Sequence, residues 1–172
     1  MREIYYLKKI KDYPGKRCDV TPIFEDSESF SEMINDLIYP FKKIKIDKIV
    51  CLDALGFVLG GAMAIKLKKP LVLARKGGKY PCLREEIISE NFIDYTKKKK
   101  SFEMKRNSIH KGEIVLIIDE WIETGAQVKT AIKIIEKLGG KVIGISCIHA
   151  DKNSKTLELF EKYNLRVLRK KA

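Results

Sequence analysis

The segment from Ile117 to Gln127 contains residue types that bind phosphate and hydroxyl groups. An acidic pair, Asp119-Glu120, precedes Thr124-Gly125 and the expected start of a helix. Backbone amides at a helix N-terminus, a threonine hydroxyl and a flexible glycine together can form a phosphate receptor. The two carboxylates would repel phosphate, but they suit sugar hydroxyls and a magnesium ion held through water. The alternative is a helix cap with exposed acids.

Two further turns carry groups suited to anions. Residues 75–79, Arg-Lys-Gly-Gly-Lys, place three cations around two glycines, a combination that can bind pyrophosphate. Residues 53–57, Asp-Ala-Leu-Gly-Phe, form a tight turn in which Gly56 could bring backbone amides against the same anion. The alternative for residues 75–79 is a solvated basic turn.

Each of these segments follows an expected strand. Short apolar runs predict strands at residues 49–52, 71–74, 114–118, 142–148 and 165–168. Helices are expected between them, at residues 30–41, 56–67, 128–138 and 156–163. This alternation predicts an α/β fold with a twisted, mostly parallel sheet flanked by helices. Ligands bind such sheets beyond the carboxyl ends of the strands.

Local signals refine three of these elements. Ser29 and Glu32 predict a capping box at the start of the first helix, and Pro40 limits its end. Gly60 and Gly61 in the middle of the next helix indicate close backbone packing. Residues 83–111 are polar with little periodicity, which predicts an extended hairpin or a mobile flap. Its four consecutive lysines, 97–100, favour a solvated tip.

Composition limits the class of protein. The 172 residues fit one domain, and 45% hydrophobic residues are enough for a core, which excludes general disorder. No apolar stretch is long enough to span a membrane, and charge interrupts the N-terminus before a signal peptide could form, so we expect a cytoplasmic protein. With 35 basic and 23 acidic residues, the net charge is +12. Nucleic acid, an acidic partner and a small polyanion are all compatible with it.

The cysteines and histidines give no sign of a metal site or a disulfide framework. The four cysteines contain no CxxC pair, and Cys51 and Cys147 lie in apolar runs, which favours buried reduced thiols. His110 and His149 have no ligand partner at metal-binding spacing, so no structural zinc is expected. A helix-turn-helix or zinc-finger signature is also missing from the sequence, so nucleic acid is not the expected partner.

Taken in order, the three segments resemble the type I phosphoribosyltransferases, and most closely the branch that uses adenine. The resemblance extends over roughly residues 10 to 168 and includes Asp12-Tyr13-Pro14. It implies one phosphoribosyltransferase domain over residues 1–172, with a base-covering segment at residues 1–28 and a flap at residues 83–111. It also implies that a purine base displaces pyrophosphate from magnesium-bound 5-phosphoribosyl-1-pyrophosphate (PRPP). With adenine the product would be AMP, a purine salvage reaction.

The resemblance also implies a role for each site residue. Asp119 and Glu120 would hold the ribose hydroxyls near the Mg²⁺ that PRPP carries, with no direct protein ligand to the metal. Asp94 matches the flap carboxylate that is brought to the base. The 5′-phosphate would lie against Glu123, Thr124, Gly125, Ala126 and Gln127. The pyrophosphate would lie against Ala54, Leu55, Arg75, Lys76 and Lys79, and the base against Arg17 and Cys18.

Several positions depart from the pattern of the adenine branch. Leu55 stands where that branch has Arg, Ala126-Gln127 stands where it has Gly-Thr, and Arg17-Cys18 replaces Phe-Arg in a shorter cover. Glu123 replaces a small residue, whereas the hypoxanthine-guanine branch has Asp there, placed to interact with the purine N7. Glu123 is therefore a candidate catalytic residue that would assist a 6-oxopurine base, and the alternative is that it points to solvent. Two alternatives therefore stay open: a 6-oxopurine phosphoribosyltransferase and a non-catalytic sensor of PRPP or nucleotides. Members of the adenine branch are commonly homodimers, and we expect the same here.

Overall fold

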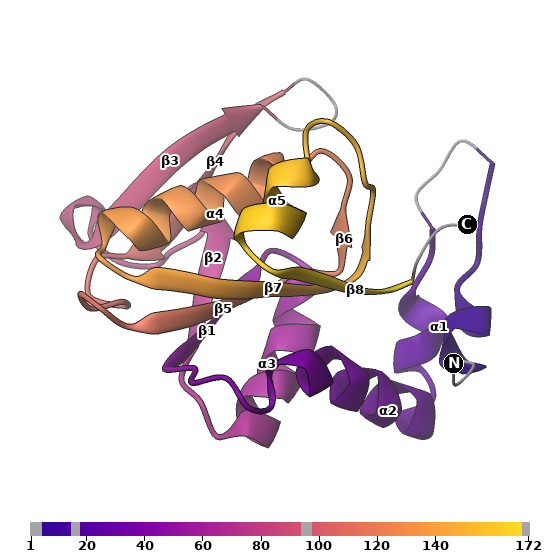
Figure 1. The fold of residues 1–172 in the computed structure, drawn as a ribbon. Helices are drawn as coiled ribbons and strands as arrows, with labels where there is room; N and C mark the ends of the chain where they lie inside the picture. The colour runs from indigo at the N-terminus through magenta and orange to yellow at the C-terminus, as the bar shows by residue number, and fades with distance from the viewer. Residues whose placement is uncertain (1–4, 15–17, 94–97, 170–172) are drawn as a thin grey trace.

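A mostly parallel sheet forms the centre of the molecule, with helices on both faces (Figure 1). The computed structural model describes residues 5–14, 18–93 and 98–169. The strand order is β3-β4-β2-β1-β5-β7-β6, and β8 pairs with β7. Only the β2–β4 and β3–β4 pairs are antiparallel among the described strands. This arrangement confirms the α/β fold that the sequence predicts.

The predicted strands and helices lie within a few residues of their expected ranges, whereas α1, β6 and the 3-10 helices had no predicted counterpart. The strands are β1 (Lys48–Leu52), β2 (Leu71–Lys76), β3 (Ile87–Ile93), β4 (Lys99–Lys105), β5 (Ile114–Ile118), β6 (Trp121–Ile122), β7 (Lys141–Ala150) and β8 (Leu165–Arg169). The α-helices are α1 (Thr21–Phe24), α2 (Ser27–Ile38), α3 (Gly56–Leu67), α4 (Ala126–Lys137) and α5 (Leu157–Lys162). Three short 3-10 helices are η1 (Tyr5–Lys9), η2 (Tyr39–Phe41) and η3 (Arg84–Glu86).

Residues 83–111 contain a hairpin, one of the two forms that the sequence predicts for them. Its strands β3 and β4 pair over their full lengths, and β4 joins β2 at the edge of the main sheet. Phe92 and Phe102 are buried, with ring centroids 5.1 Å apart. The strands that carry the hairpin tip are therefore part of the hydrophobic core.

The sheet separates two hydrophobic layers. Val50 and Leu52 of β1 belong to the layer beneath α4 and α5, whereas Ile49 and Cys51 belong to the layer that contains α2 and α3. Successive side chains of a strand point to opposite faces, so continuous apolar strands supply both layers. Figure 1 shows α4 and α5 above the sheet and α2 and α3 below it.

Helix α2 begins differently from the prediction. Its N-cap is Asp26, whose Oδ1 accepts a hydrogen bond of 2.6 Å from the backbone N of Ser29. That bond holds the pKa of Asp26 below its ordinary value. Ser29 therefore lies inside the helix, and its buried Oγ has no partner among the described residues. The predicted capping box of Ser29 and Glu32 is wrong because an ionised carboxylate three residues before Ser29 is the better acceptor.

The glycines of α3 show that only one of the pair makes the predicted close contact. A Cβ on Gly60 would lie 2.5 Å from the Cβ of Cys51 in β1. A Cβ on Gly61 would have no heavy atom within 4 Å outside its own helix and chain neighbours. Helix α3 is thus packed against β1 through Gly60. None of the helices in the described ranges is long and apolar enough to cross a membrane.

Substituting these two glycines separately tests the packing. Gly60→Ala should lower the free energy of unfolding by about 1–3 kcal/mol because the new methyl group overlaps Cys51. Gly61→Ala is the matched control and should raise it by about 0.5–1 kcal/mol, the helix propensity gain of alanine. Urea unfolding followed by circular dichroism measures both. Equal effects of the two substitutions would contradict the proposed contact.

Candidate active site

The three predicted segments meet at one edge of the sheet. Strands β1, β2 and β5 are parallel neighbours, with Leu52 opposite Ala74 and Cys51 opposite Ile118. Their carboxyl ends therefore lie side by side. Asp53 and Asp119 each follow one of these ends, and the Asp53 backbone N donates to the Ala74 carbonyl at 3.1 Å. The convergence that the sequence predicts is thus present in the structure.

The acidic pair begins with a buried carboxylate. Asp119 is 4% exposed, and its Oδ1 accepts a hydrogen bond of 2.9 Å from the backbone N of Glu120. Glu120 is half-buried, and its carbonyl accepts from the backbone N of Ile148 at 3.1 Å. A Cβ on Gly56 would lie 3.1 Å from the Ile118 carbonyl oxygen. The absence of a side chain on Gly56 lets the start of α3 pack against the acidic pair.

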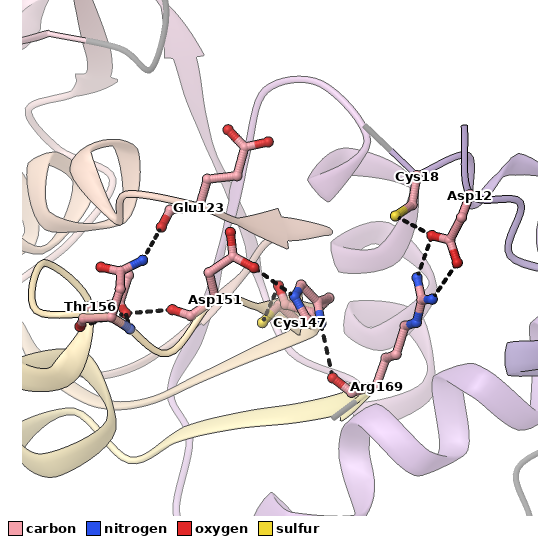
Figure 2. A network of polar contacts seen from close by, with 9 residues as sticks. Asp12, Cys18, Glu123, Cys147, Asp151, Thr156 and Arg169 are labelled. Carbon is pink, nitrogen blue, oxygen red and sulfur yellow. Dashed lines mark hydrogen bonds and ion pairs between the residues drawn. The ribbon is translucent and has the colours of Figure 1, made fainter. Parts of the chain in front are cut away.

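The predicted phosphate loop leads into α4 through a left-handed glycine. Gly125 is the N-cap with φ of +71°, a conformation that a residue with a side chain rarely adopts. Thr124 Oγ1 accepts a hydrogen bond of 3.4 Å from the backbone N of Ala126. Asn153 Nδ2 donates to the Glu123 carbonyl at 2.9 Å, and Figure 2 shows the Glu123 carboxylate pointing away from that contact. The loop is therefore held by hydrogen bonds between side chains and its backbone at both ends.

The basic turn at the end of β2 is tied to the neighbouring turn. Lys76 Nζ lies 3.5 Å from Asp53 Oδ1, and this ion pair joins the two segments predicted to bind pyrophosphate. The guanidinium of Arg75 lies over the ring of Tyr80, 5.6 Å from its centroid. Burial raises the pKa of the Tyr80 hydroxyl to about 12, so this group stays protonated and donates to the Leu73 carbonyl. Lys79 is exposed.

A buried glutamate of β4 forms a hydrogen bond with the backbone of this basic turn. Glu103 of β4 is 2% exposed, and it accepts hydrogen bonds from the backbone N of Gly78 at 2.9 Å and from Arg84 Nη1 at 2.7 Å. A cavity of about 260 Å³ opens beside it, lined by Lys76, Gly77, Gly78, Lys100, Ser101 and Glu103. Lys100 lines this cavity and is exposed, so it is solvated as the lysine run predicts and also faces the basic turn. Glu103 had no predicted role, because its partners come from a turn distant in sequence.

A second cavity lies between the N-terminal cover and the acidic pair. It has a volume of about 180 Å³ and is lined by Cys18, Asp19, Val20, Leu55, Glu120 and Trp121. The ring of Trp121 is stacked on His149, with centroids 4.3 Å apart. An aromatic side chain in such a wall suits a planar heterocycle. The predicted base residue Cys18 lies here, and Trp121 is a further wall that its position directly after the acidic pair could have suggested.

Cys18 forms a hydrogen bond with another residue of the cover. Its Sγ donates to Asp12 Oδ1 at 2.6 Å. Burial and this hydrogen bond raise the pKa of the Cys18 thiol, so it is protonated near neutral pH. The predicted residues Arg17 and Asp94 lie outside the described residues. Among the residues that the structure describes, no group of three or more His, Cys, Asp and Glu side chains is placed to hold a metal ion.

Comparison with known proteins identifies the class. The phosphoribosyl transferase domain model matches residues 21–168. The adenine phosphoribosyltransferase of Roseobacter denitrificans is 38% identical over 147 residues, covering 83% of this chain and 81% of that protein. This chain therefore belongs to the phosphoribosyltransferase family, a group of pentosyltransferases.

The fold of this chain is similar to solved structures from the adenine branch of this family. Adenine phosphoribosyltransferase from Thermoanaerobacter pseudethanolicus is similar with a TM-score of 0.87 and 26% identity, over 95% of this chain and 96% of that one. The Saccharomyces cerevisiae enzyme, crystallised with an imino-altritol bisphosphate and adenine, has a TM-score of 0.82 and 26% identity, over 96% and 97% of the two chains. The type I phosphoribosyltransferase fold predicted from the sequence is confirmed.

Asp12→Asn should make the Cys18 thiol more reactive. The carboxylate of Asp12 raises the thiol pKa, so its replacement by a neutral amide lowers that pKa and increases the thiolate fraction at pH 8. The alkylation rate with iodoacetamide, followed by peptide mass spectrometry, should rise several-fold at Cys18. Cys82, the other half-buried cysteine, provides an internal control whose rate should not change. An unchanged rate at Cys18 would show that Asp12 does not control its ionisation.

Proposed function

We propose that this chain is an adenine phosphoribosyltransferase, which converts adenine and PRPP into AMP and pyrophosphate. The observation that carries the proposal is the meeting of the phosphate loop, the acidic pair, the basic turn and an aromatic-walled cavity at one sheet edge. The named relatives and the solved structures support adenine over the two alternatives.

The residues at this sheet edge can be assigned to the three parts of PRPP: the 5′-phosphate, the ribose and the pyrophosphate. The start of α4, with Thr124 and Gly125 before it, presents backbone amides to the 5′-phosphate. Asp119 and Glu120 accept hydrogen bonds from the ribose hydroxyls. Arg75, Lys76 and Lys79 face the pyrophosphate together with the turn at Ala54 and Leu55, and Leu55 also lines the base cavity. Lys100, which lines the same cavity as Lys76, adds a further cation there.

The reaction then follows from positioning and electrostatics. A bond forms between a nitrogen of the base and the ribose carbon as the bond from that carbon to the pyrophosphate oxygen breaks. Positive charge develops on the ribose ring, where the carboxylates of Asp119 and Glu120 oppose it, while the cations of the basic turn stabilise the leaving group. The cover over the base cavity excludes water, which would otherwise compete as a nucleophile.

Two further components complete the proposal. Asp94, the residue after Ile93 in the sequence, is assigned to the base proton, in keeping with the family resemblance. Carboxylate oxygens are ligands that Mg²⁺ accepts, so Asp119 and Glu120 fit a magnesium ion carried by PRPP and contacted through water. Bound Mg²⁺ supplies positive charge to the phosphate oxygens.

The organisation and setting of the protein belong to the same proposal. Residues 1–172 form one catalytic domain, with the base-covering segment at residues 1–28 and the flap at residues 83–111. The protein acts in the cytoplasm as a homodimer, as expected for the adenine branch. The fold supports the division within the domain because β3 and β4 project from the sheet edge beside the basic turn (Figure 1).

A base panel tests the activity directly. Pyrophosphate release from PRPP and Mg²⁺ should be seen with adenine and be at least tenfold slower with hypoxanthine, guanine and xanthine. Asp119→Asn should lower kcat by about 10²–10³, since it removes charge that stabilises the transition state. Turnover on a 6-oxopurine alone would replace the proposal with the first alternative. PRPP binding without turnover on any of the four bases would favour a sensor.

Glu123 provides a separate test of base choice. Glu123 lies in the phosphate loop, where its carbonyl accepts a hydrogen bond from Asn153. The base cavity is lined by other residues, among them Trp121. We therefore expect Glu123→Ala to keep the preference for adenine, with the ratio of kcat/KM for adenine to that for hypoxanthine changed less than threefold. A shift of this ratio by tenfold or more would assign base selection to Glu123.

A further inference from the structure

The base cavity is assembled from segments that are far apart in sequence. One wall is the cover, which contributes Cys18 and Val20, and another is Trp121 of β6. A planar ligand between these walls is held well only if their separation is fixed. The contacts that link the cover to the β6 side therefore decide how well the cavity fits a base.

The cover is attached to the last described residue of the chain. Asp12 accepts two hydrogen bonds from Arg169, at 3.1 Å from Nη1 to Oδ1 and at 2.7 Å from Nη2 to Oδ2. Such a two-point pair fixes direction as well as distance. The same Asp12 Oδ1 accepts from the Cys18 thiol, so the ion pair reaches a residue that lines the cavity. Figure 2 shows the guanidinium of Arg169 extended toward Asp12 and Cys18.

A backbone bridge joins the two segments of the cover that contain Asp12 and Cys18. The backbone N of Lys11 donates to the Asp19 carbonyl at 3.0 Å, and the backbone N of Asp19 donates to the Lys11 carbonyl at 2.8 Å. Asp12 and Cys18 lie directly inside this bridge. A displacement of Asp12 therefore moves Cys18 and the adjacent cavity wall together.

The backbone of Arg169 supports the opposite wall. Arg169 is paired with His149 across β7 and β8, and its carbonyl oxygen lies 3.0 Å from His149 Nδ1. The other ring nitrogen of His149 lies 3.0 Å from Asp151 Oδ1. These contacts fix the orientation of the imidazole, which is 1% exposed and stacked against Trp121. Arg169 thus contacts both sides of the cavity. Its side chain binds Asp12 of the cover, and its backbone carbonyl contacts His149, which packs against Trp121.

We propose that Arg169 is a positioning residue for the base, which sets the separation between the cover and Trp121 through its bidentate pair with Asp12. This inference rests on the proposed function and adds to it a residue that touches neither PRPP nor the base. The side chains of Arg169 and Asp12 are 22% and 60% exposed. A pair this exposed contributes little to global stability, so its loss loosens the part of the cover around Asp12 and Cys18 without unfolding the domain.

Two ligands separate the base site from the phosphate site. AMP occupies both, whereas ribose 5-phosphate lacks the base. Arg169→Gln should weaken AMP binding about threefold to fivefold while changing the affinity for ribose 5-phosphate less than twofold, both measured by calorimetry. Trp121 is the only tryptophan of the chain, so its fluorescence gives a second reading of AMP binding at the cavity wall. Asp12→Asn should reproduce the effect from the other side of the pair.

The controls distinguish a local effect from a general one. Arg166→Gln removes an exposed arginine from the same strand and should leave both affinities unchanged. The double variant Asp12→Arg with Arg169→Asp should restore most of the AMP affinity because it re-forms the ion pair in reverse. Wild-type AMP affinity in Arg169→Gln, or an equal loss for both ligands, would overturn the inference while leaving the proposed function intact. Wild-type protein that binds ribose 5-phosphate but not AMP would overturn both.

Discussion

The parallel pairing of β1, β2 and β5 is the constraint on which the site depends. Because the three strands run in the same direction and in matched register, they deliver Asp53, Lys76 and Asp119 to one edge. The side chains that follow the strands could not meet if any of these strands were reversed. The chain brings carboxylates and cations together in this way, and the ion pair between Asp53 and Lys76 joins two of the turns.

Backbone geometry at this edge matters as much as the charged side chains. Gly56 lets α3 begin against the strand that ends in the acidic pair, and Gly125 turns the chain into α4 with φ of +71°. The buried carboxylate of Glu103 binds a backbone amide of the basic turn and fixes the shape of its cavity. An anion at this edge therefore meets a preformed receptor, which lowers the reorganisation required during the reaction.

The sequence predicted the sheet, its main strands and the residues at the strand ends because these depend on local patterns. Apolar runs and the glycine at position 125 carry that information within a few residues. The parts that were missed depend on contacts between distant segments: Lys100 and Glu103 around the basic turn, and Trp121 beneath the cover. The two-residue strand β6 is too short to show any periodicity, and the cap of α2 depended on the choice between Asp26 and Ser29.

The two hydrophobic layers support different parts of the edge at which the strands end. Val128 and Leu159, which support the phosphate loop and the start of α4, belong to the layer above the sheet. Cys18, Leu55 and Trp121, which enclose the base cavity, pack against the layer below it. A substitution that moves a wall of the base cavity therefore lies in a different layer from one that moves the phosphate loop.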